Sequence, residues 1–428
     1  MTRRNGDTET RRADDSGQQI PASPRLSISA SPFLRHGAPL SRSTIIIGIV
    51  SLLSDISTEM VYPILPIFIR DVLKAPATAL GLIEGIANGT SSVATGFSGL
   101  LSDRIGKRKP VAFAGYALTA LSKPFIAIAA VWQVVLAARF TDRLGKGIRS
   151  APKDALIADS VDDESRGRAY GFERTMDYTG AVVGPLVGLA LFVTLGLDRV
   201  RMIFLLSAVP ATIAALLILS LRERDLQAKQ RTQALRLTLS GTTREYKRFL
   251  LASGVFGLAN SANAFLILRS QGLGLDARWT IIAYALYNAV AALASMPAGV
   301  ASDRLGRRNL LIVGYLIYAI TYGGFGLASK AWVVWPLFAF YGLFAALTDG
   351  VGKSLAVDTA GSAGRATAIG VYSMVIGLTQ IAASYIGGLL WDKIDPAATF
   401  YFGAALAALA MLLLFTLSPA TGRQRQSD

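Results

Sequence analysis

Residues 139–159, RFTDRLGKGIRSAPKDALIAD, gather charged side chains within an otherwise apolar part of the chain. At 100° per residue these side chains fall within an arc of roughly 140° on one helix. They are Arg139, Asp142, Arg143, Lys146, Arg149, Lys153 and Asp154. Because a charge facing lipid costs at least about 2.5 kcal/mol at the centre of a helix, this face must contact protein or a water-filled cavity.

Carboxylate partners for these cations occur on neighbouring apolar segments. They are Asp55 and Glu59 on the first segment, Glu84 on the second, and Glu173 and Asp177 on the fifth. Asp55, Arg143 and Asp177 lie about half-way through their segments. Burial favours the protonated form of a carboxyl and a nearby cation favours the ionised form, so these three residues predict a proton switch. A purely structural network of buried ion pairs is the alternative.

The second half of the chain carries fewer charges but several polar residues. Asn260, Asn263 and Asn288 are candidates for a cavity wall, with hydrogen bonding between helices as the alternative. Asp349 and Lys353 are charges within a later segment. The full predicted set for proton coupling and the substrate cavity is Asp55, Glu59, Glu84, Arg139, Asp142, Arg143, Lys146, Glu173, Asp177, Asn260, Asn263 and Asn288.

Four further charges are interpreted as peripheral. Arg149, Lys153 and Asp154 lie nearer the end of their segment and are expected to serve as gate or interface charges. Lys123 lies near the end of the third segment, where we expect its ammonium group to snorkel to the membrane surface.

The elements that must position these residues are membrane helices. Of 428 residues, 52% are hydrophobic and only 17% are charged, and the mean hydropathy is +0.45, whereas soluble proteins carry about a quarter charged residues. Apolar stretches of about 20 residues recur, long enough to cross a hydrocarbon core of about 30 Å. We predict twelve spans, near 43–69, 77–101, 110–131, 132–158, 167–195, 200–221, 248–272, 279–301, 309–329, 331–358, 364–390 and 397–418.

Composition excludes several kinds of chemistry. Cysteine is absent and the single histidine, His36, lies in a polar leader, so thiol nucleophiles and Cys/His zinc sites are excluded. We predict no metal, no cofactor and no catalytic residue, since no nucleophile–base pair or nucleotide loop is recognisable. The net charge of +15 lies mostly between apolar runs, which indicates membrane sidedness rather than nucleic-acid binding.

Lysine and arginine are concentrated in alternate connections between the spans and at both ends of the chain. By the positive-inside rule these segments face the cytoplasm, which predicts a multi-pass protein of the bacterial inner membrane with both termini inside. We also expect the protein to be a monomer. The predicted organisation is a disordered tail (1–42), a six-helix half (43–221), a basic cytoplasmic linker (222–247), a second six-helix half (248–418) and a cytoplasmic tail (419–428).

The two halves repeat each other. GLLSDRIGKRKP at 99–110 matches GVASDRLGRRNL at 299–310 at an offset of 200, and Asp159 matches Asp358 at an offset of 199. Duplicated halves in a membrane protein predict a site at the interface between them.

Twelve spans, a basic central linker and two copies of G-x-x-S-D-R-x-G-[KR]-[RK] resemble the major facilitator superfamily. The resemblance implies an all-α membrane fold of twelve transmembrane helices in two pseudo-symmetric six-helix halves. It also implies gating by the paired loop motifs. The predicted gating residues are Asp103, Arg104, Arg108, Asp303, Arg304, Arg308, Asp159 and Asp358. The family's fourth-helix arginine corresponds to either Arg139 or Arg143.

Residues 171–188 resemble the fifth-helix antiporter motif of proton-driven exporters in that family. Gly180, Gly184 and Gly188 recur every fourth residue beside Pro185 and form a smooth stripe that another helix can approach. Plain tight packing is the alternative to a role in setting the direction of transport.

These features together predict a proton-coupled secondary transporter that exports a small organic molecule by alternating access. Its partners are the substrate, protons and the lipid bilayer. The excess of cations on 139–153 keeps a symporter or uniporter importing an organic anion as the alternative. A membrane enzyme or a non-transporting sensor on the same fold is a third hypothesis.

Overall fold

A computed structural model of the protein describes residues 40–105, 107–162, 165–221, 242–361 and 365–417. Within these ranges, the side chains of residues 96, 99–105, 303, 365 and 366 are not described. Nearly all of the predicted tail 1–42, most of the linker 222–247 and the tail 419–428 therefore lie outside the described residues. All the helices below belong to one unit of the chain.

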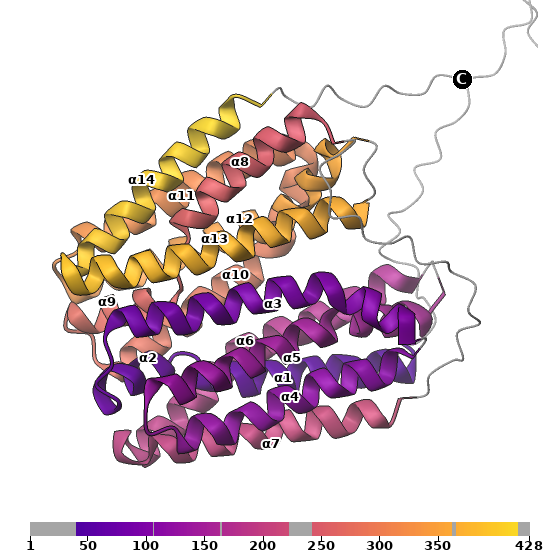
Figure 1. The fold of residues 1–428 in the computed structure, drawn as a ribbon, viewed down its shortest axis with the longest axis horizontal. Coiled ribbons are helices and arrows are strands. Elements are labelled where there is room, and N and C mark those ends of the chain that lie inside the picture. The colour runs from indigo at the N-terminus through magenta and orange to yellow at the C-terminus, as the bar shows by residue number, and fades with distance from the viewer. Residues whose placement is uncertain (1–39, 106, 163–164, 222–241, 362–364, 418–428) are drawn as a thin grey trace, which may run out of the picture. The chain divides into compact units, whose positions relative to one another are not determined.

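Every regular element in the described residues is helical, and the helices form two successive groups (Figure 1). The first group comprises α1 (Arg42–Val61), α2 (Leu65–Ile67), α3 (Ala77–Ile105), α4 (Arg108–Ile128), α5 (Trp132–Asp159), α6 (Arg166–Leu195) and α7 (Val200–Leu219). The second comprises α8 (Arg244–Ala259), α9 (Ala264–Gly272), α10 (Ala277–Leu305), α11 (Arg307–Leu327), α12 (Val334–Thr359), α13 (Arg365–Lys393) and α14 (Pro396–Phe415). We call the end of the bundle that holds Arg42 and Phe415 the terminal end, and the end that holds Ala77 and Trp132 the distal end.

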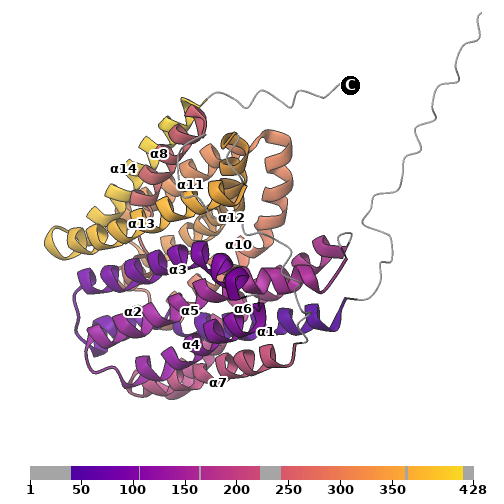
Figure 2. The ribbon, with the colours of Figure 1, turned by 45° about the vertical axis from the view of Figure 1, so that its right-hand side comes forward.

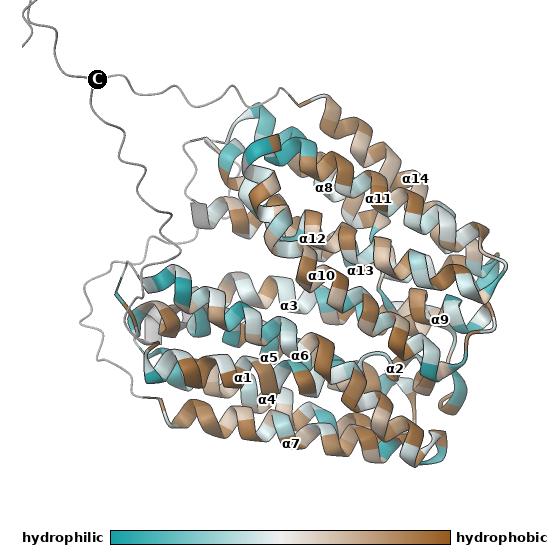
Figure 3. Ribbon diagram, turned by 180° about the vertical axis from the view of Figure 1, so that it is seen from behind, coloured by the Kyte–Doolittle hydropathy of each residue, from teal (hydrophilic) through white to brown (hydrophobic). Residues whose placement is uncertain are grey.

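The helices have the length and polarity that a bilayer requires. Ten helical stretches among the described residues are long and apolar enough to cross a membrane. α3 and α5 are comparable in length to these ten stretches but are more polar than they are. α5 carries the charged face of residues 139–154. Figure 3 shows that α7 and α14 are largely hydrophobic, whereas hydrophilic residues gather near the helix ends. Leu216 and Leu412 are each 58% exposed on these outer helices, as lipid-facing side chains are. The protein is a multi-pass membrane protein.

Two of the predicted spans, near 43–69 and 248–272, are found as spans but each contains a break in its helix. A break at Tyr62–Ile64 separates α1 from α2, and a break at Asn260–Asn263 separates α8 from α9. Pro63 has no N–H to donate in the first break. In the second break, asparagine and serine side chains compete for backbone hydrogen bonds. Interrupted helices leave backbone groups available within the membrane.

The two groups meet along α3 and α13, which run side by side (Figures 1 and 2). The contact depends on glycine. A Cβ atom at Gly85 would lie 3.0 Å from the carbonyl oxygen of Ile381, and one at Gly377 would lie 2.5 Å from the Cβ of Ser92. A larger side chain at either position would push the two groups apart.

The predicted glycine stripe of α6 faces α1. A Cβ atom at Gly180 would lie 2.8 Å from the carbonyl oxygen of Leu52, and one at Gly184 would lie 2.7 Å from the Cβ of Glu59. Gly171, at the terminal end of the same helix, has no atom within 4 Å of the corresponding position. The stripe therefore lets α1 carry Asp55 and Glu59 close to α6.

This packing generates a stability prediction. Alanine is more favourable than glycine in a helix by about 1 kcal/mol, yet Gly184→Ala should lower the melting temperature in detergent by several degrees because its Cβ collides with α1. Gly171→Ala, whose methyl group meets open space, should leave the melting temperature unchanged or raise it. Intrinsic fluorescence during heating measures both, and equal melting temperatures for the two variants would contradict the packing argument.

Candidate functional site

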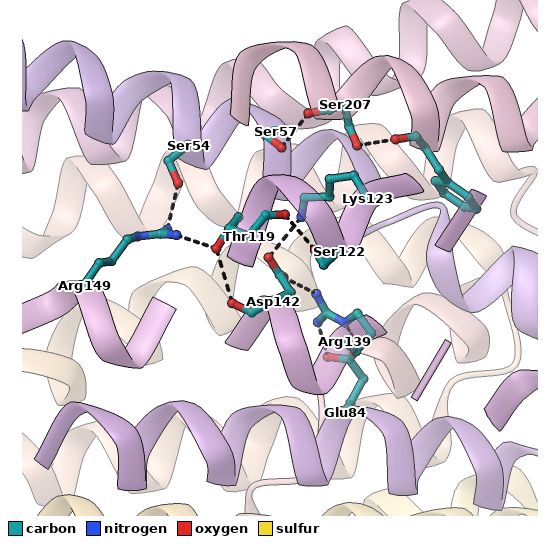
Figure 4. A network of polar contacts seen from close by, with 11 residues as sticks. Ser54, Ser57, Glu84, Thr119, Ser122, Lys123, Arg139, Asp142, Arg149 and Ser207 are labelled. Atoms are coloured by element: carbon teal, nitrogen blue, oxygen red, sulfur yellow. Dashed lines mark hydrogen bonds and ion pairs between the residues drawn. The ribbon is translucent and has the colours of Figure 1, made fainter. Parts of the chain in front are cut away.

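The centre of the first group is a closed cluster of four ionised side chains (Figure 4). Arg139 holds Glu84 with two hydrogen bonds, from Nε to Oε1 at 2.9 Å and from Nη2 to Oε2 at 2.8 Å. Its Nη1 lies 3.2 Å from an oxygen of Asp142, whose other oxygen lies 3.2 Å from Nζ of Lys123. Arg139, Glu84 and Lys123 are each 1% exposed. The cluster balances two cations against two carboxylates.

The cluster shows that the expectation for Lys123 is wrong and that three of the predicted cavity residues lie elsewhere. Lys123 does not snorkel to the membrane surface, because an ion-pair partner on the adjacent helix α5 is within its reach. Glu84, Arg139 and Asp142 are sealed inside the first group, and none of them lines the cavity described below. Their arrangement ties α3, α4 and α5 together.

Arg149 and Lys153 continue the charged face of α5 toward the terminal end. Arg149 donates to the hydroxyl groups of Thr119 on α4 and Ser54 on α1, both at 2.7 Å (Figure 4). Its guanidinium group also lies over the ring of Tyr116. Lys153 pairs with Glu173 of α6, which also accepts a hydrogen bond of 2.8 Å from the Ser51 hydroxyl. These side chains join helices within the first group.

Asp55 and Asp177, predicted from sequence as parts of a proton switch, lie next to each other. Their carboxyl groups lie on the facing helices α1 and α6, close enough to interact electrostatically. The cations that interact electrostatically with this pair include Lys146 and Lys153. Glu59 lies close enough to interact with both Asp55 and Lys146.

Arg143, which sequence reasoning placed beside this pair, interacts instead with Glu59 and Asp142. Arg143 lies nearly one helical turn closer to the distal end than Lys146 does. Its side chain is 9% exposed, and within the described residues its Nε has no hydrogen-bond partner.

The paired loop motifs make equivalent ion pairs at the terminal end. Arg108 at the start of α4 pairs with Asp159 of α5, and Arg307 at the start of α11 lies 2.6 Å from Asp358 of α12. Each pair joins helices within one group. Arg304 is exposed. The predicted gating residues whose side chains lie outside the described part of the chain are Asp103, Arg104 and Asp303.

The two motifs differ in register by one residue. The counterpart of Arg108 is Arg307, and pairing it with Arg308 at an offset of 200 is wrong. Lys107 adds one residue before α4, whereas α11 begins directly after Gly306. Arg308 instead donates to the last two carbonyl oxygens of α14, at 2.9 and 2.8 Å. The change of offset from 200 to 199 is therefore located at Lys107.

A polar cavity of about 340 Å³ lies mainly between helices of the second group. It is lined by Ser91, Ser92, Thr95, Arg174, Phe256, Asn260, Leu311, Tyr315, Phe344, Thr348, Asp349, Lys353, Tyr372, Ser373 and Ile376. Of the predicted cavity residues, Asn260 alone is in this lining. Three charged residues of the lining were missing from the predicted set: Arg174, Asp349 and Lys353. Each is a charge within a predicted span, and that feature of the sequence was sufficient reason to predict them as cavity residues.

The remaining two asparagines do not line this cavity. Asn263 accepts a hydrogen bond of 2.8 Å from the Tyr341 hydroxyl. Among the described residues, Nδ2 of Asn288 is buried without a hydrogen-bond partner. The break beside Asn263 is stabilised by the hydroxyl of Tyr318, which donates to the carbonyl oxygen of Ala259 at 2.8 Å.

Hydrogen bonds between the two groups, within the described residues, join side chains at the distal end or in the middle of the bundle. At the distal end, Asp392 of α13 accepts from the backbone N–H groups of Ala77 and Thr78, at 3.0 and 2.7 Å, and so caps α3. Nearer the middle, Tyr284 donates to Glu59 at 3.1 Å. Figure 2 shows α6 and α10 diverging toward the terminal end.

Two groups of membrane-crossing helices that meet beside a polar cavity define a membrane transport protein. The chain belongs to the Major Facilitator Superfamily, whose sequence model matches residues 47–282 and 249–428. The predicted fold class, twelve transmembrane helices in two pseudo-symmetric halves, and the family resemblance are confirmed.

The chain is also similar to individual transporters. An MFS-type transporter of Methanocaldococcus jannaschii, described as uncharacterized, is 34% identical over 383 residues, which cover 88% of this chain and 94% of the relative. A tetracycline resistance protein, class C, of Escherichia coli is 26% identical over 310 residues, which cover 68% and 75%. The crystal structure of a D-xylose-proton symporter has a TM-score of 0.72 and 17% identity, and the match covers 89% of this chain and 98% of that one.

The buried cluster generates a second prediction. Arg139→Ala removes both hydrogen bonds that hold the buried Glu84 carboxyl group, which should cost about 3–5 kcal/mol of stability. Arg70→Ala is the matched control, because Arg70 is 37% exposed and lies 3.9 Å from its partner Asp392. Thermal unfolding in detergent compares the two, and similar melting temperatures would show that the cluster does not stabilise the first group.

Proposed function

We propose that the protein is a proton-coupled exporter that moves a small organic molecule across the inner membrane by alternating access. The observation that carries the proposal is the proximity of the Asp55 and Asp177 carboxyl groups, which the close packing of α1 on Gly180 of α6 brings together. Two ionised carboxylates that interact in a buried site repel each other, and this repulsion favours binding of one proton to the pair. When substrate or Lys146 neutralises this pair instead, the proton is free to leave.

Two further observations support export. The tetracycline resistance protein is a relative over more than half of the chain. The closed distal end and the more widely separated terminal end fit a carrier that loads its cargo from the side of the chain termini. Lysine and arginine are more frequent at the terminal end, which supports the cytoplasm as that side.

The proton pair is tested by Asp55→Asn. The protein is reconstituted in liposomes containing a pH-sensitive dye, and a compound that raises its melting temperature, beginning with tetracycline, is added across an imposed pH gradient. The wild-type protein should dissipate the pH gradient as the compound moves. In Asp55→Asn this coupled proton flux should be at least about tenfold lower. The control is Asp71→Asn, an exposed carboxylate at the distal end of the first span, which should retain it.

The same assay gives the direction of coupling. Compound that moves against the protons supports the exporter, whereas compound that moves together with them contradicts export. That second outcome would favour an importer of an organic anion, for which the specific observation is the presence of Arg174 and Lys353 on a cavity with the single acid Asp349. Unchanged coupled flux in Asp55→Asn would remove the basis of the proton pair.

Membrane sidedness is tested with single cysteines, since the chain has none of its own. Asp162→Cys lies in the α5–α6 connection at the terminal end, and Ser329→Cys lies in the α11–α12 connection at the distal end; both positions are exposed. In intact cells a membrane-impermeant maleimide should label Ser329→Cys and not Asp162→Cys. Labelling of Asp162→Cys alone would reverse the proposed sidedness.

A further inference from the structure

The polar cavity carries an unbalanced charge. Arg174 of α6 and Lys353 of α12 line it together with one carboxylate, Asp349. The Arg174 guanidinium lies 5.2 Å from the centre of the Tyr178 ring. Within the described residues, neither Arg174 nor Lys353 forms an ion pair with a carboxylate. Two cations against one acid give the lining residues a formal charge of +1, which favours an anionic ligand. Three acids that do not line the cavity also act electrostatically on these cations: Asp154, Glu173 and Asp177.

Several uncharged polar groups of the lining offer hydrogen-bond acceptors. The hydroxyl groups of Ser92, Thr95 and Thr348 each donate to a backbone carbonyl of their own helix, at 3.1, 2.8 and 2.9 Å. Their protons are therefore engaged, and their oxygen lone pairs remain. Oδ1 of Asn260 is buried and, within the described residues, has no hydrogen-bond partner. A buried acceptor without a partner favours a ligand that brings its own O–H or N–H donor to Asn260.

Flat aromatic rings form the rest of the wall. Phe256 and Tyr315 stack with their ring centres 3.9 Å apart and their planes at 4°. Phe344 lies 5.7 Å from Phe256 in the same cluster. Such rings bind flat apolar groups by stacking and by edge contacts. A ligand that matches this wall has a planar apolar body.

We propose that this cavity binds a small aromatic organic acid that also carries a hydroxyl or amino hydrogen-bond donor. The carboxylate lies between Arg174 and Lys353, the donor reaches Asn260, and the ring lies against Phe256 and Tyr315. The inference rests on the proposed transport function, because it treats the cavity as the substrate site.

The proposal is tested by equilibrium binding to the purified full-length protein in detergent. Four probes isolate the features of the ligand: 4-hydroxyphenylacetate, its amide, the amine tyramine, and phenylacetate, which lacks the donor. The acid should bind at least about tenfold more tightly than the amide or the amine, and several-fold more tightly than phenylacetate. Equal affinity for acid, amide and amine, or no saturable binding of the acid at about 10 mM, would overturn the proposal.

Three variants assign the contacts. Lys353→Met and Arg174→Gln should each weaken binding of 4-hydroxyphenylacetate about tenfold and reduce its advantage over the amide. Asn260→Leu should remove the advantage over phenylacetate while leaving the preference for the acid. Lys330→Met, an exposed cation in the distal α11–α12 connection, is the matched control and should bind as the wild-type protein does. The comparison of the four probes on wild-type protein does not depend on the folding of any variant.

Failure of this inference is distinguishable from failure of the proposed function. Selective binding of the acid without any flux in liposomes would remove the transport proposal and leave the ligand class standing. Proton-coupled flux of compounds without preference for an acid would remove the ligand class and leave the transport proposal standing.

Discussion

The hydrocarbon region of a membrane supplies no water, so a charge inside this bundle must be neutralised by another helix. Arg139 meets that constraint most completely, because it holds Glu84 with two hydrogen bonds and shares Asp142 with Lys123. The cluster sets the position of α5 along its axis, and its rotation about that axis, relative to α3 and α4. The positions of the other cations on α5 depend on this placement of the helix.

The two groups of helices share a backbone plan and differ in chemistry. The first group contains the buried ion pairs and the Asp55–Asp177 pair. The second group contains stacked aromatic rings, and a tyrosine hydroxyl satisfies the carbonyl oxygen at the end of α8. In the proposed cycle the proton is therefore bound in one group and most of the substrate wall belongs to the other. Glycine contacts between α3 and α13 and the hydrogen bond from Tyr284 to Glu59 connect the two.

Sequence reasoning predicted the elements and one face of the site. Apolar length predicted the helices, the 100° periodicity predicted the charged face of α5, and the spacing of Gly180 and Gly184 predicted a surface that α1 can approach. The prediction failed where an outcome depended on a neighbour in space. Lys123 was expected at the membrane surface because its partner, Asp142, belongs to another helix. The insertion of Lys107 was overlooked because both copies still match the motif residue by residue. Only a comparison of their ion pairs shows the extra residue.

The sequence by itself determined that this protein is a bundle of membrane helices, that its halves are duplicated, and that charge is concentrated on α5. These properties follow from hydropathy and periodicity, which are local. Only the tertiary structure decided which charges neutralise each other, which carboxyl groups lie side by side, and which polar residues line the cavity. Those outcomes depend on the packing of helices far apart in the chain, and Coulombic and hydrogen-bond energies at a few ångströms are set by that packing.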